Sequence, residues 1–385
     1  MRNFAAIKSV LSNLPSRVLL LFLPVALLIG ASAYFVYQAE LRRLHTENAA
    51  IAKDRLLVGV ASIERNLQTA TRDLDYLANR RTNLQLIDNP NKLNLSNMAS
   101  DWAAFLQAKE NYDQIRWIDE KGMERLRVNY ATPNPMVVPT AKLQNKRGRY
   151  FFDDINRLKQ GEVFISPLDL NVEDDHIEIP FKPTIRFGAP MFDSKGTRRG
   201  IFLINYSAAS LLERFSYFKG IKEKPAWLVN QSGYWLISLK ADDEFGFMFN
   251  RTDLTMKNRY PGAWKQMLAE QEGQFETEEG LWTFDTVYPQ QAAQTGRSVL
   301  VSLPGSESNG DKRFWKAIYL LPSDEYNAGI PLFAAMLGGA AILLLILFYM
   351  GIWRLVRFQG NVRRRASRSR LSRAKLILAA ISSRR

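Results

Sequence analysis

The chain has 385 residues and no cysteine, with 52 Lys and Arg against 38 Asp and Glu, a formal net charge of +14. Without cysteine, neither a disulfide framework nor a thiolate metal site is possible. A basic excess usually suggests nucleic acid as a partner, but three basic residues precede the first apolar run and eleven lie from Arg354 onward, with no acid among them. These fourteen account for the whole excess, so the region between is formally neutral and nucleic acid is excluded.

The first apolar run, Val18–Val36, has nineteen residues without a charge, enough to cross a membrane as a helix. A cleaved signal peptide is the alternative, since Ala31 and Ala33 resemble a cleavage site. The run is longer than a typical signal-peptide core, and a helical pattern follows without a break. We therefore expect an uncleaved anchor.

The second apolar run, Ile330–Trp353, is more hydrophobic and ends in aromatic residues suited to a membrane interface, Tyr349 and Trp353. Its small residues at four-residue spacing permit close helix contact, including a dimer, although such residues are common in membrane helices generally. The basic segments 1–17 and 354–385 predict cytoplasmic termini by the positive-inside rule. The sequence therefore predicts a two-pass protein of a bacterial inner membrane, with residues 37–329 outside the cytoplasm.

Residues 37–79 are predicted to form one long helix. Apolar residues recur in steps of four and three at Leu56, Val60, Ile63, Leu67, Ala70, Leu74 and Leu77. This pattern is typical of a coiled-coil seam, or of an amphipathic helix packed on its own domain.

An α+β fold with two modules is predicted to follow. In residues 80–218, the membrane-distal module, a glycine-turn hairpin spans Tyr112–Tyr130, a helix lies near 146–159, and two strands flank a turn at 193–196. In residues 219–328, the membrane-proximal module, a hairpin at 226–238 and a helix at 259–270 precede strands at 273–278, 281–288, 298–303 and 314–321.

These fragments resemble the double Cache (tandem PAS-like) sensor domain of bacterial transmembrane histidine kinases, diguanylate cyclases and chemoreceptors. The resemblance rests on YDQIRWIDEKGMERLRVN at 112–129, FISPLDLNVE at 164–173, IPFKPTIRFGAPMFD at 179–193, and AWLVNQSGYWLISLKADDEFGFMF with RYPGAW at 226–264. It implies a five-stranded antiparallel sheet in each module and a small ligand bound by the distal one.

Such receptors continue past the second span into an output domain, whereas this sequence has only residues 354–385 there. We expect a truncated or frameshifted reading frame, or else a separate cytoplasmic output protein. The basic tail itself suits anionic lipid headgroups of the bilayer.

Arginines at central positions of the predicted strands mark the predicted ligand site. Alternation places Tyr112, Gln114 and Arg116 on one strand face, with Arg127 on the next strand and Arg186 on a third. An arginine buried there must be paired or must face a polar cavity. The sequence therefore suggests a carboxylate clamp, or internal pairing with Asp119, Glu124 or Asp169.

The run Arg149-Tyr150-Phe151-Phe152 loosely resembles the helix of amino-acid-binding Cache domains, in which the arginine holds the ligand carboxylate and aromatic residues wall the pocket. This resemblance implies an amino-group acceptor, for which Asp153 and Asp169 are candidates. We expect a small carboxylate-bearing ligand such as an amino acid, and a homodimer.

No catalytic residues, metal site or cofactor are predicted. His176 stands beside Glu173, Asp174 and Asp175, but one imidazole in a charged loop is more often solvated. We therefore predict a transmembrane signal receptor and no enzyme. The alternative is a membrane-tethered periplasmic enzyme or envelope-assembly factor built on the same scaffold.

Overall fold

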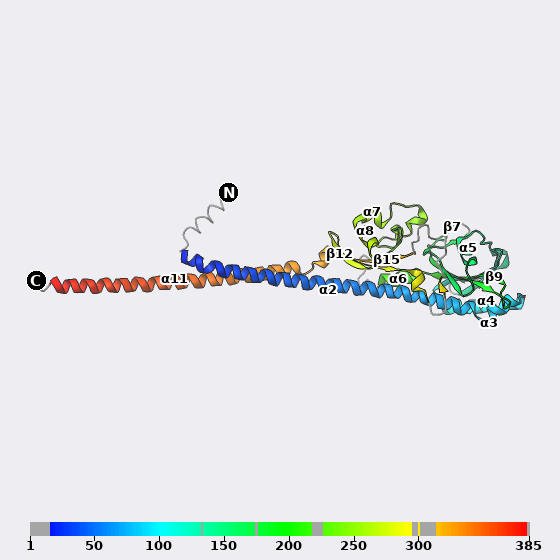
Figure 1. Ribbon diagram of the computed structural model, residues 1–385, viewed down its shortest axis with the longest axis horizontal. Helices are drawn as coiled ribbons and strands as arrows, with labels where there is room; N and C mark the ends of the chain where they lie inside the picture. Colours follow the sequence, from blue (N-terminus) through cyan, green and yellow to red (C-terminus); the bar gives the residue numbers. More distant parts are fainter. Residues whose placement is uncertain are drawn as a thin grey trace. The chain divides into compact units, whose positions relative to one another are not determined.

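The computed structural model describes residues 16–131, 134–173, 176–217, 226–294, 299–300 and 313–382. The chain divides into two compact units. One is Ala49–Tyr326, and the other combines Met1–Asn48 with Asn327–Arg385. Helix α2 (Ser16–Ala78) runs through the boundary between them as a single helix, as the sequence predicted for its outer part (Figure 1).

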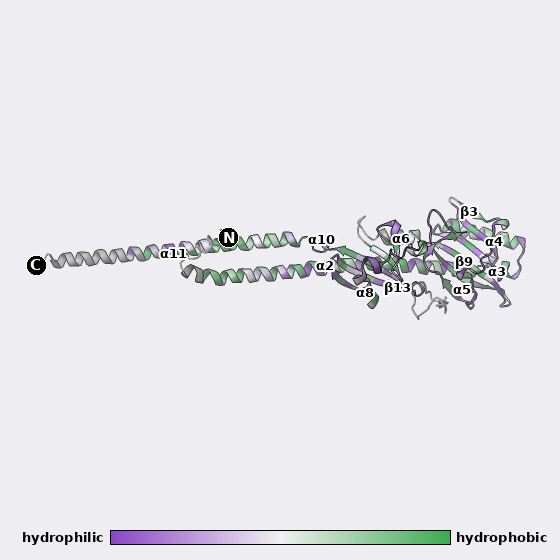
Figure 2. Ribbon diagram, turned by 90° about the horizontal axis from the view of Figure 1, so that it is seen from above, coloured by the Kyte–Doolittle hydropathy of each residue, from purple (hydrophilic) through white to green (hydrophobic). Residues whose placement is uncertain are grey.

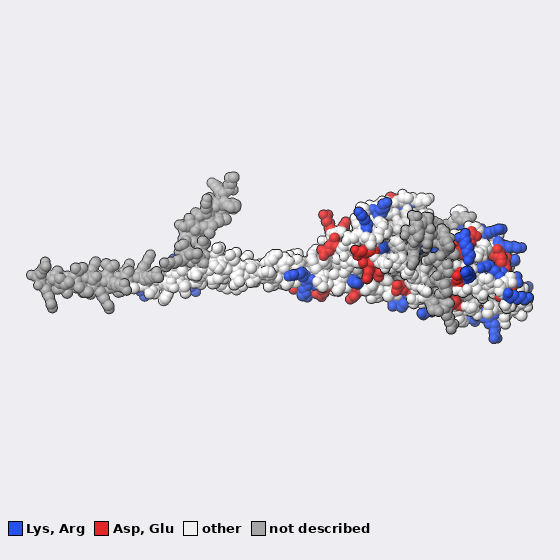
Figure 3. Space-filling model, viewed as in Figure 1, with Lys and Arg blue, Asp and Glu red and all other residues white. Residues whose placement is uncertain are grey.

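The two-segment unit is built from the first part of α2 and from α11 (Ile330–Ser382). Each carries an apolar run with the length and composition of a membrane span. Leu28 and Phe35 are each 67% exposed, and Figure 3 shows few charged atoms along these runs. The helices lie side by side, with the Phe22 and Phe348 rings 6.3 Å apart (Figure 2). Such exposed apolar surface suits lipid. The helical continuation of α11 to Ser382 was not predicted.

The first module has an 8-stranded sheet in the order β14-β4-β8-β9-β1-β2-β3, with β5 beside β8. Its strands are β1 (Tyr112–Ile118), β2 (Glu124–Ala131), β3 (Asn134–Val137), β4 (Glu162–Ile165), β5 (Asp169–Leu170), β8 (Pro183–Phe192), β9 (Arg198–Ser207) and β14 (Val299–Leu300). Its helices are α3 (Arg81–Asp88), α4 (Lys92–Ala108), η1 (Thr140–Lys142), α5 (Tyr150–Asn156) and α6 (Ala209–Tyr217). A separate two-stranded ribbon joins β6 (Val172–Glu173) to β7 (His176–Ile177).

The second module has a 5-stranded antiparallel sheet in the order β11-β10-β15-β13-β12. Its strands are β10 (Ala226–Asn230), β11 (Trp235–Ile237), β12 (Gly273–Thr277), β13 (Gly280–Val287) and β15 (Trp315–Pro322). Its helices are η2 (Ala241–Asp243), η3 (Gly246–Phe249), α7 (Met256–Arg259), α8 (Pro261–Ala269), α9 (Pro289–Ala292) and α10 (Ser323–Tyr326).

The α+β class and the antiparallel sheets agree with the prediction, and two details differ. The sheet of the first module exceeds five strands. The strand predicted at 298–303 was assigned to the second module, but its described part, β14, pairs in parallel with β4 of the first. Alternation within a strand says nothing about which sheet it joins, because that choice depends on long-range pairing.

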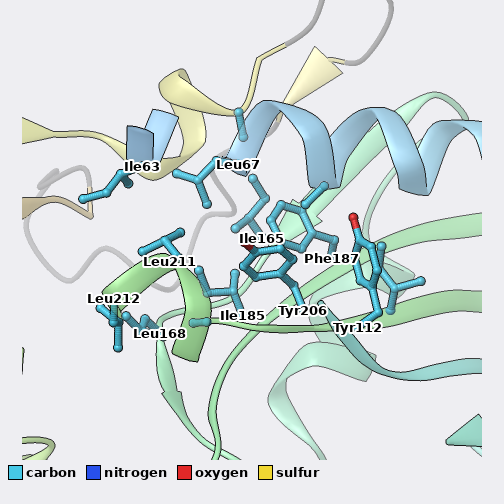
Figure 4. Packing of buried hydrophobic residues seen from close by; sticks show 14 of the residues in the cluster. Ile63, Leu67, Tyr112, Ile165, Leu168, Ile185, Phe187, Tyr206, Leu211 and Leu212 are labelled. Atoms are coloured by element: carbon cyan, nitrogen blue, oxygen red, sulfur yellow. The ribbon is translucent and has the colours of Figure 1, made fainter. Parts of the chain in front are cut away.

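The apolar stripe of α2 packs on the helix's own domain. All seven residues of the predicted seam are at most 7% exposed and belong to the core shared by α2, α4 and both sheets. Figure 4 shows Ile63 and Leu67 of this helix above Tyr112, Tyr206 and Phe187. The coiled-coil interpretation of this stripe is therefore wrong, and the amphipathic-helix alternative is correct.

The two hairpin turns of the first module use the same local chemistry. Asp119 Oδ1 accepts the backbone N–H groups of Lys121 and Met123, and Asp193 Oδ1 accepts those of Lys195 and Thr197. Each turn is completed by a glycine at positive φ, Gly122 at 86° and Gly196 at 75°. These turns set the register of the strands that carry the site.

Candidate ligand-binding site

The sheet of the first module buries its two faces differently. One face, with Ile115, Phe202 and Ile204, packs in the core with α2. The other is apolar under α5, where Phe151, Phe152 and Ile155 cover β9 and β4. A Cβ at Gly188 would lie 2.3 Å from Ile155 Cδ1, so glycine permits this close helix packing. Toward β1 and β2, the same face becomes polar.

The polar part is a buried group of charged and amide side chains that we call the arginine cluster. It consists of Gln114, Arg116, Glu124, Arg127, Lys146, Asp169, Asn171, Glu173 and Arg186. Arg116 and Arg186 are each only 2% exposed. Four cations face three carboxylates, a formal excess of one positive charge. Because burying an uncompensated charge is expensive, such a cluster favours a negatively charged group.

The Arg186 side of the cluster is internally satisfied. Arg186 Nη1 lies 2.6 Å from Asp169 Oδ1, and its guanidinium also donates to Asn171 Oδ1 at 3.2 Å and to the Tyr150 hydroxyl at 3.3 Å. Burial of the Tyr150 hydroxyl raises its pKa to about 12, so it remains protonated. The internal pairing of Arg186 with Asp169 that the sequence suggested is confirmed.

The Arg116 and Arg127 side is not satisfied in this way. Glu124 forms ion pairs with both arginines, at 3.7 Å from Arg116 Nε and 3.3 Å from Arg127 Nη1. On this side, three buried donor atoms and three buried acceptor atoms have no hydrogen-bond partner among the described residues. These are Arg116 Nε, Arg127 Nε, Arg127 Nη1, Glu124 Oε1, Asn129 Oδ1 and Asn205 Oδ1. Each such buried group costs about 1–3 kcal/mol unless something pairs with it.

Glu173 reaches this side from β6. Its Oε1 accepts from Arg116 Nη2 at 3.0 Å and from Gln114 Nε2 at 3.2 Å, and its Oε2 accepts from Lys146 Nζ at 3.4 Å. Burial by itself would raise the pKa of Glu173, but the charges of Arg116 and Lys146 and the hydrogen bond from Gln114 outweigh it and lower the pKa to about 2. Glu173 is therefore ionised at neutral pH.

A cavity of about 560 Å³ lies beside α3 and α4, on the sheet face of Trp117 and not on that of Arg116; of the nine cluster residues Glu124 alone is in its lining, and the Glu124 side chain is 0% exposed. Leu86, Leu95, Trp117 and Met123 form much of its apolar wall. Its volume lies within the range of about 300–1,000 Å³ typical of small-molecule sites.

Four of the predicted site residues come together in the cluster: Arg116, Arg127, Asp169 and Arg186. Tyr112 does not, and the predicted face for it is wrong. A register shift between Tyr112 and Gln114 turns the tyrosine toward α2, where its hydroxyl donates to Asp73 at 2.7 Å. A β-bulge of this kind is not visible in an alternation pattern.

The Arg149–Phe152 run borders the cluster: the Tyr150 hydroxyl donates to Asp169 and accepts from Arg186, and the Arg186 guanidinium lies 5.8 Å from the Phe151 ring centroid. Phe151 and Phe152 are 1% and 4% exposed and belong to the apolar core under α5. The Arg149 guanidinium lies 5.8 Å from the Phe151 ring centroid. Their role as ligand contacts stays a prediction.

Lys146 and Glu173 were not predicted as site residues. Glu173 was considered only with His176 as a metal site, but it points into the arginine cluster, while His176 is exposed and Asp174 and Asp175 lie outside the described residues. The charge of the buried arginines could have indicated Glu173, because such side chains need acids to pair with. The fragment at 164–173, on which the Cache resemblance partly rests, contains two acids, Asp169 and Glu173.

Comparison with known proteins gives a family and a fold. Residues 61–297 match the family described as bacterial histidine kinase, sensor domain. Among curated proteins, no match to the chain was found.

Three solved structures represent the fold. A domain of a sensory box/GGDEF family protein from Vibrio parahaemolyticus has 19% identity and a TM-score of 0.58, over 74% of this chain and 99% of that one. The extracellular domain of vpHK1S-Z8, described as a histidine kinase, has 20% identity and a TM-score of 0.58, over 74% and 94%. The ligand-binding domain of the Campylobacter jejuni chemoreceptor Tlp3, solved with 4-methylisoleucine, has 10% identity and a TM-score of 0.50, over 74% and 95%.

Proposed function

Because this chain belongs to the family of bacterial histidine kinase sensor domains, we propose that it is a transmembrane receptor whose double Cache domain senses a small carboxylate-bearing molecule. Domains of this family bind ligands and are not themselves catalytic. The observation that carries the proposal is the buried, net-positive arginine cluster, in which Arg116 Nε and two nitrogen atoms of Arg127 have no hydrogen-bond partner among the described residues.

The unpaired atoms indicate the class of ligand. Guanidinium nitrogens of Arg116 and Arg127 suit a carboxylate, which arginine binds strongly through charge-assisted hydrogen bonds. The unpaired oxygens of Glu124, Asn129 and Asn205 suit a donor such as an ammonium or hydroxyl group. A molecule with both, an α-amino acid or α-hydroxy acid, complements the site. The chemoreceptor Tlp3, which shares the fold, was solved with 4-methylisoleucine and with L-valine.

Isothermal titration of the full-length chain in lipid nanodiscs tests this proposal. The panel contains amino acids, hydroxy acids, simple carboxylic acids, amines and nucleobases. We expect an acid from the first two classes to bind, and Arg116→Met to weaken it about 10- to 100-fold, the equivalent of a charged hydrogen bond. The control is Arg157→Met, since Arg157 is exposed, pairs with Asp154, and lies outside both the cluster and the cavity lining. Binding that ignores Arg116, or that is confined to amines or nucleobases, contradicts the proposal.

We also propose a topology with both termini in the cytoplasm and residues 37–329 outside it. The basic ends support it, and residues 354–385 would then contact anionic headgroups and a separate cytoplasmic output protein. The absence of cysteine makes single-cysteine reporters unambiguous. In spheroplasts, a membrane-impermeant thiol reagent should label Thr46→Cys and spare Ser369→Cys. Labelling of the second variant contradicts this topology.

A homodimer is proposed through the face of α2 that its own domain leaves free. Ile51, Val58, Arg65 and Arg72 repeat at seven-residue intervals and are exposed, with Ile51 at 42% and Val58 at 46%. Oxidative cross-linking should therefore join Val58→Cys chains in membranes. Leu56→Cys, buried at 4% exposed, is the matched control that should not cross-link. Equal yields from both variants would argue against this interface.

A further inference from the structure

Glu173 differs from the other acids of the arginine cluster in the segment that carries it. Asp169 lies on β5, which pairs with β8 of the main sheet, and Glu124 lies on β2 within that sheet. Glu173 lies on β6, which among the described strands pairs with β7 alone, each strand having two residues. A ribbon this small is marginally stable by itself. Moving Glu173 therefore requires no break in the main sheet.

Glu173 is also more exposed than the groups it contacts. The four groups that contact Glu173 are at most 7% exposed and belong to the body of the module: Gln114, Arg116, Arg127 and Lys146. The Glu173 side chain itself is 21% exposed. The cationic side of the contact is thus fixed and buried, and the carboxylate approaches it from the more accessible side, as a ligand would.

The contacts of Glu173 are those expected for a bound carboxylate. Its two oxygens lie within 3.0–3.7 Å of nitrogen atoms from two arginines, one lysine and one amide. Arg116 Nε and Arg127 Nε and Nη1 still have no hydrogen-bond partner among the described residues despite this contact. A carboxylate placed there by a free molecule could meet the same donors, provided that Glu173 leaves.

We propose that the Glu173 carboxylate is a built-in occupant of the carboxylate subsite, which a ligand carboxylate must displace. The inference rests on the proposed function, because it concerns the same arginine cluster. Displacement of Glu173 raises the formal charge of the cluster from +1 to +2, and the incoming carboxylate returns it to +1. Glu173 therefore keeps the unliganded cluster nearly neutral and lowers the apparent affinity for ligand. If it vacates the subsite about 1–10% of the time, affinity falls by about 10- to 100-fold.

A different role for Glu173 makes the opposite prediction. If its carboxylate accepted the ammonium group of an amino acid, removing its charge would weaken binding. A probe that carries a carboxylate and no ammonium separates the two roles. We choose propionate, measured by titration into the full-length chain in nanodiscs.

Glu173→Gln keeps the shape of the side chain and removes its charge. We expect it to bind propionate about 10- to 100-fold more tightly than the wild-type chain. The matched control is Glu213→Gln on α6, which is exposed and lies outside the arginine cluster, so it should leave the affinity unchanged. Unchanged or weaker binding by Glu173→Gln, or no propionate binding by either protein, overturns the inference.

A second variant gives an independent readout through stability. Glu173→Ala removes the side chain and leaves the cations without this partner, so its thermal midpoint should fall. Propionate should then raise that midpoint more than an equal concentration of chloride does, because a ligand of the folded state stabilises it. The wild-type midpoint should respond less. An equal response in both proteins, or none in Glu173→Ala, overturns the inference.

The experiments distinguish a failure of the proposed ligand class from a failure of the Glu173 inference. If wild-type chains bind a member of the amino-acid and hydroxy-acid panel in an Arg116-dependent way, but Glu173→Gln gains nothing, the proposed function stands and the built-in occupant is wrong. If Glu173→Gln gains affinity for propionate while the wild-type chain binds no panel member, the occupant stands and the ligand class is wrong.

Discussion

In both modules, one sheet face packs against α2 and the other is covered by short helices and loops, but the covered faces are filled differently. In the first module it carries Arg116, Arg127 and Arg186 next to the apolar patch under α5. In the second module, the equivalent face is closed by large apolar side chains from the sheet and from α7 and α8. These include Trp227, Val229, Trp264, Met267, Trp282, Ile318 and Leu320. The same type of sheet therefore supports a polar site in one module and an apolar core in the other.

Buried cations show the same contrast. The second module buries Lys316 at 3% exposed, and its ammonium group meets three acceptors: the carbonyls of Glu270 and Gln271 and the Thr286 hydroxyl, at 2.6, 3.3 and 2.6 Å. An ammonium group has three hydrogens, so this cation is fully paired. Arg116 and Arg127 keep unpaired donors. We infer that the second module uses its buried charge for structure, and the first keeps part of its charge available for a ligand.

The largest expected loss of stability follows a substitution in the apolar face of the second module. Trp282 is fully buried, with ring centroids of Trp227 and Tyr260 at 5.5 and 5.1 Å. Trp282→Ala should lower the free energy of unfolding by about 3–5 kcal/mol because it leaves a large cavity. Ligand affinity should not change. Denaturant titration and calorimetry of the full-length chain check both, with the exposed Leu268→Ala as control. A matching loss of affinity would place ligand binding in the second module.

A comparable loss is expected from Arg186→Met, because it leaves the buried Asp169 carboxylate without its cation, at a cost of about 3–5 kcal/mol. The control is Arg251→Met in the second module, where both partners of the Arg251–Asp253 pair are more than half exposed; it should cost less than about 1 kcal/mol. Denaturant titration measures both. Adding Asp169→Leu to Arg186→Met should recover most of the loss, and failure to recover would mean that the pair is not the cause.

Glu173 predicts how stability depends on pH. Its pKa falls from an ordinary value of 4.5 to about 2 in the folded chain. The stabilisation it provides is therefore complete above pH 4.5 and is lost as the pH falls toward 2, up to about 3 kcal/mol in total. Glu173→Gln should lack this loss. Unfolding midpoints of the detergent-solubilised chain, followed from neutral pH downward, measure the difference, and parallel curves for the two proteins would contradict it.

The smallest expected changes in stability come from substituting Lys316, the fully paired cation, and Arg127, whose hydrogen bonding is incomplete. Lys316→Met leaves three acceptors without their donor and should cost about 1–3 kcal/mol. Arg127→Met removes the excess positive charge of the cluster and leaves Glu124 paired with Arg116, so it should change stability by less than about 1 kcal/mol while weakening the ligand. Denaturant titration of both variants decides the order. If Arg127→Met costs more than Lys316→Met, the proposed division between structural and available charge is wrong.

Much of the fold could be predicted because its signals are local. The glycine turns at Gly122 and Gly196, the period-two strands, the long apolar stripe of α2 and the two apolar runs are each encoded within a few neighbouring residues. Of the site, Arg116, Arg127 and Arg186 were predicted because an arginine in a central strand needs a partner or a polar cavity, and Asp169 was predicted as an acid that could supply one. The partner of Arg186 was also among the acids expected.

The sequence by itself determined the α+β class, the two apolar runs with their basic flanks, and the need for acids to pair with the buried arginines. Only the tertiary structure decided which face each residue occupies. A bulge moved Tyr112 toward α2, β14 joined the sheet of the first module, and the stripe of α2 packed on its own domain. It also brought Glu173 and Lys146 to the cluster from segments distant in the chain. Local patterns follow from backbone geometry, whereas these contacts depend on how separate elements pair and pack.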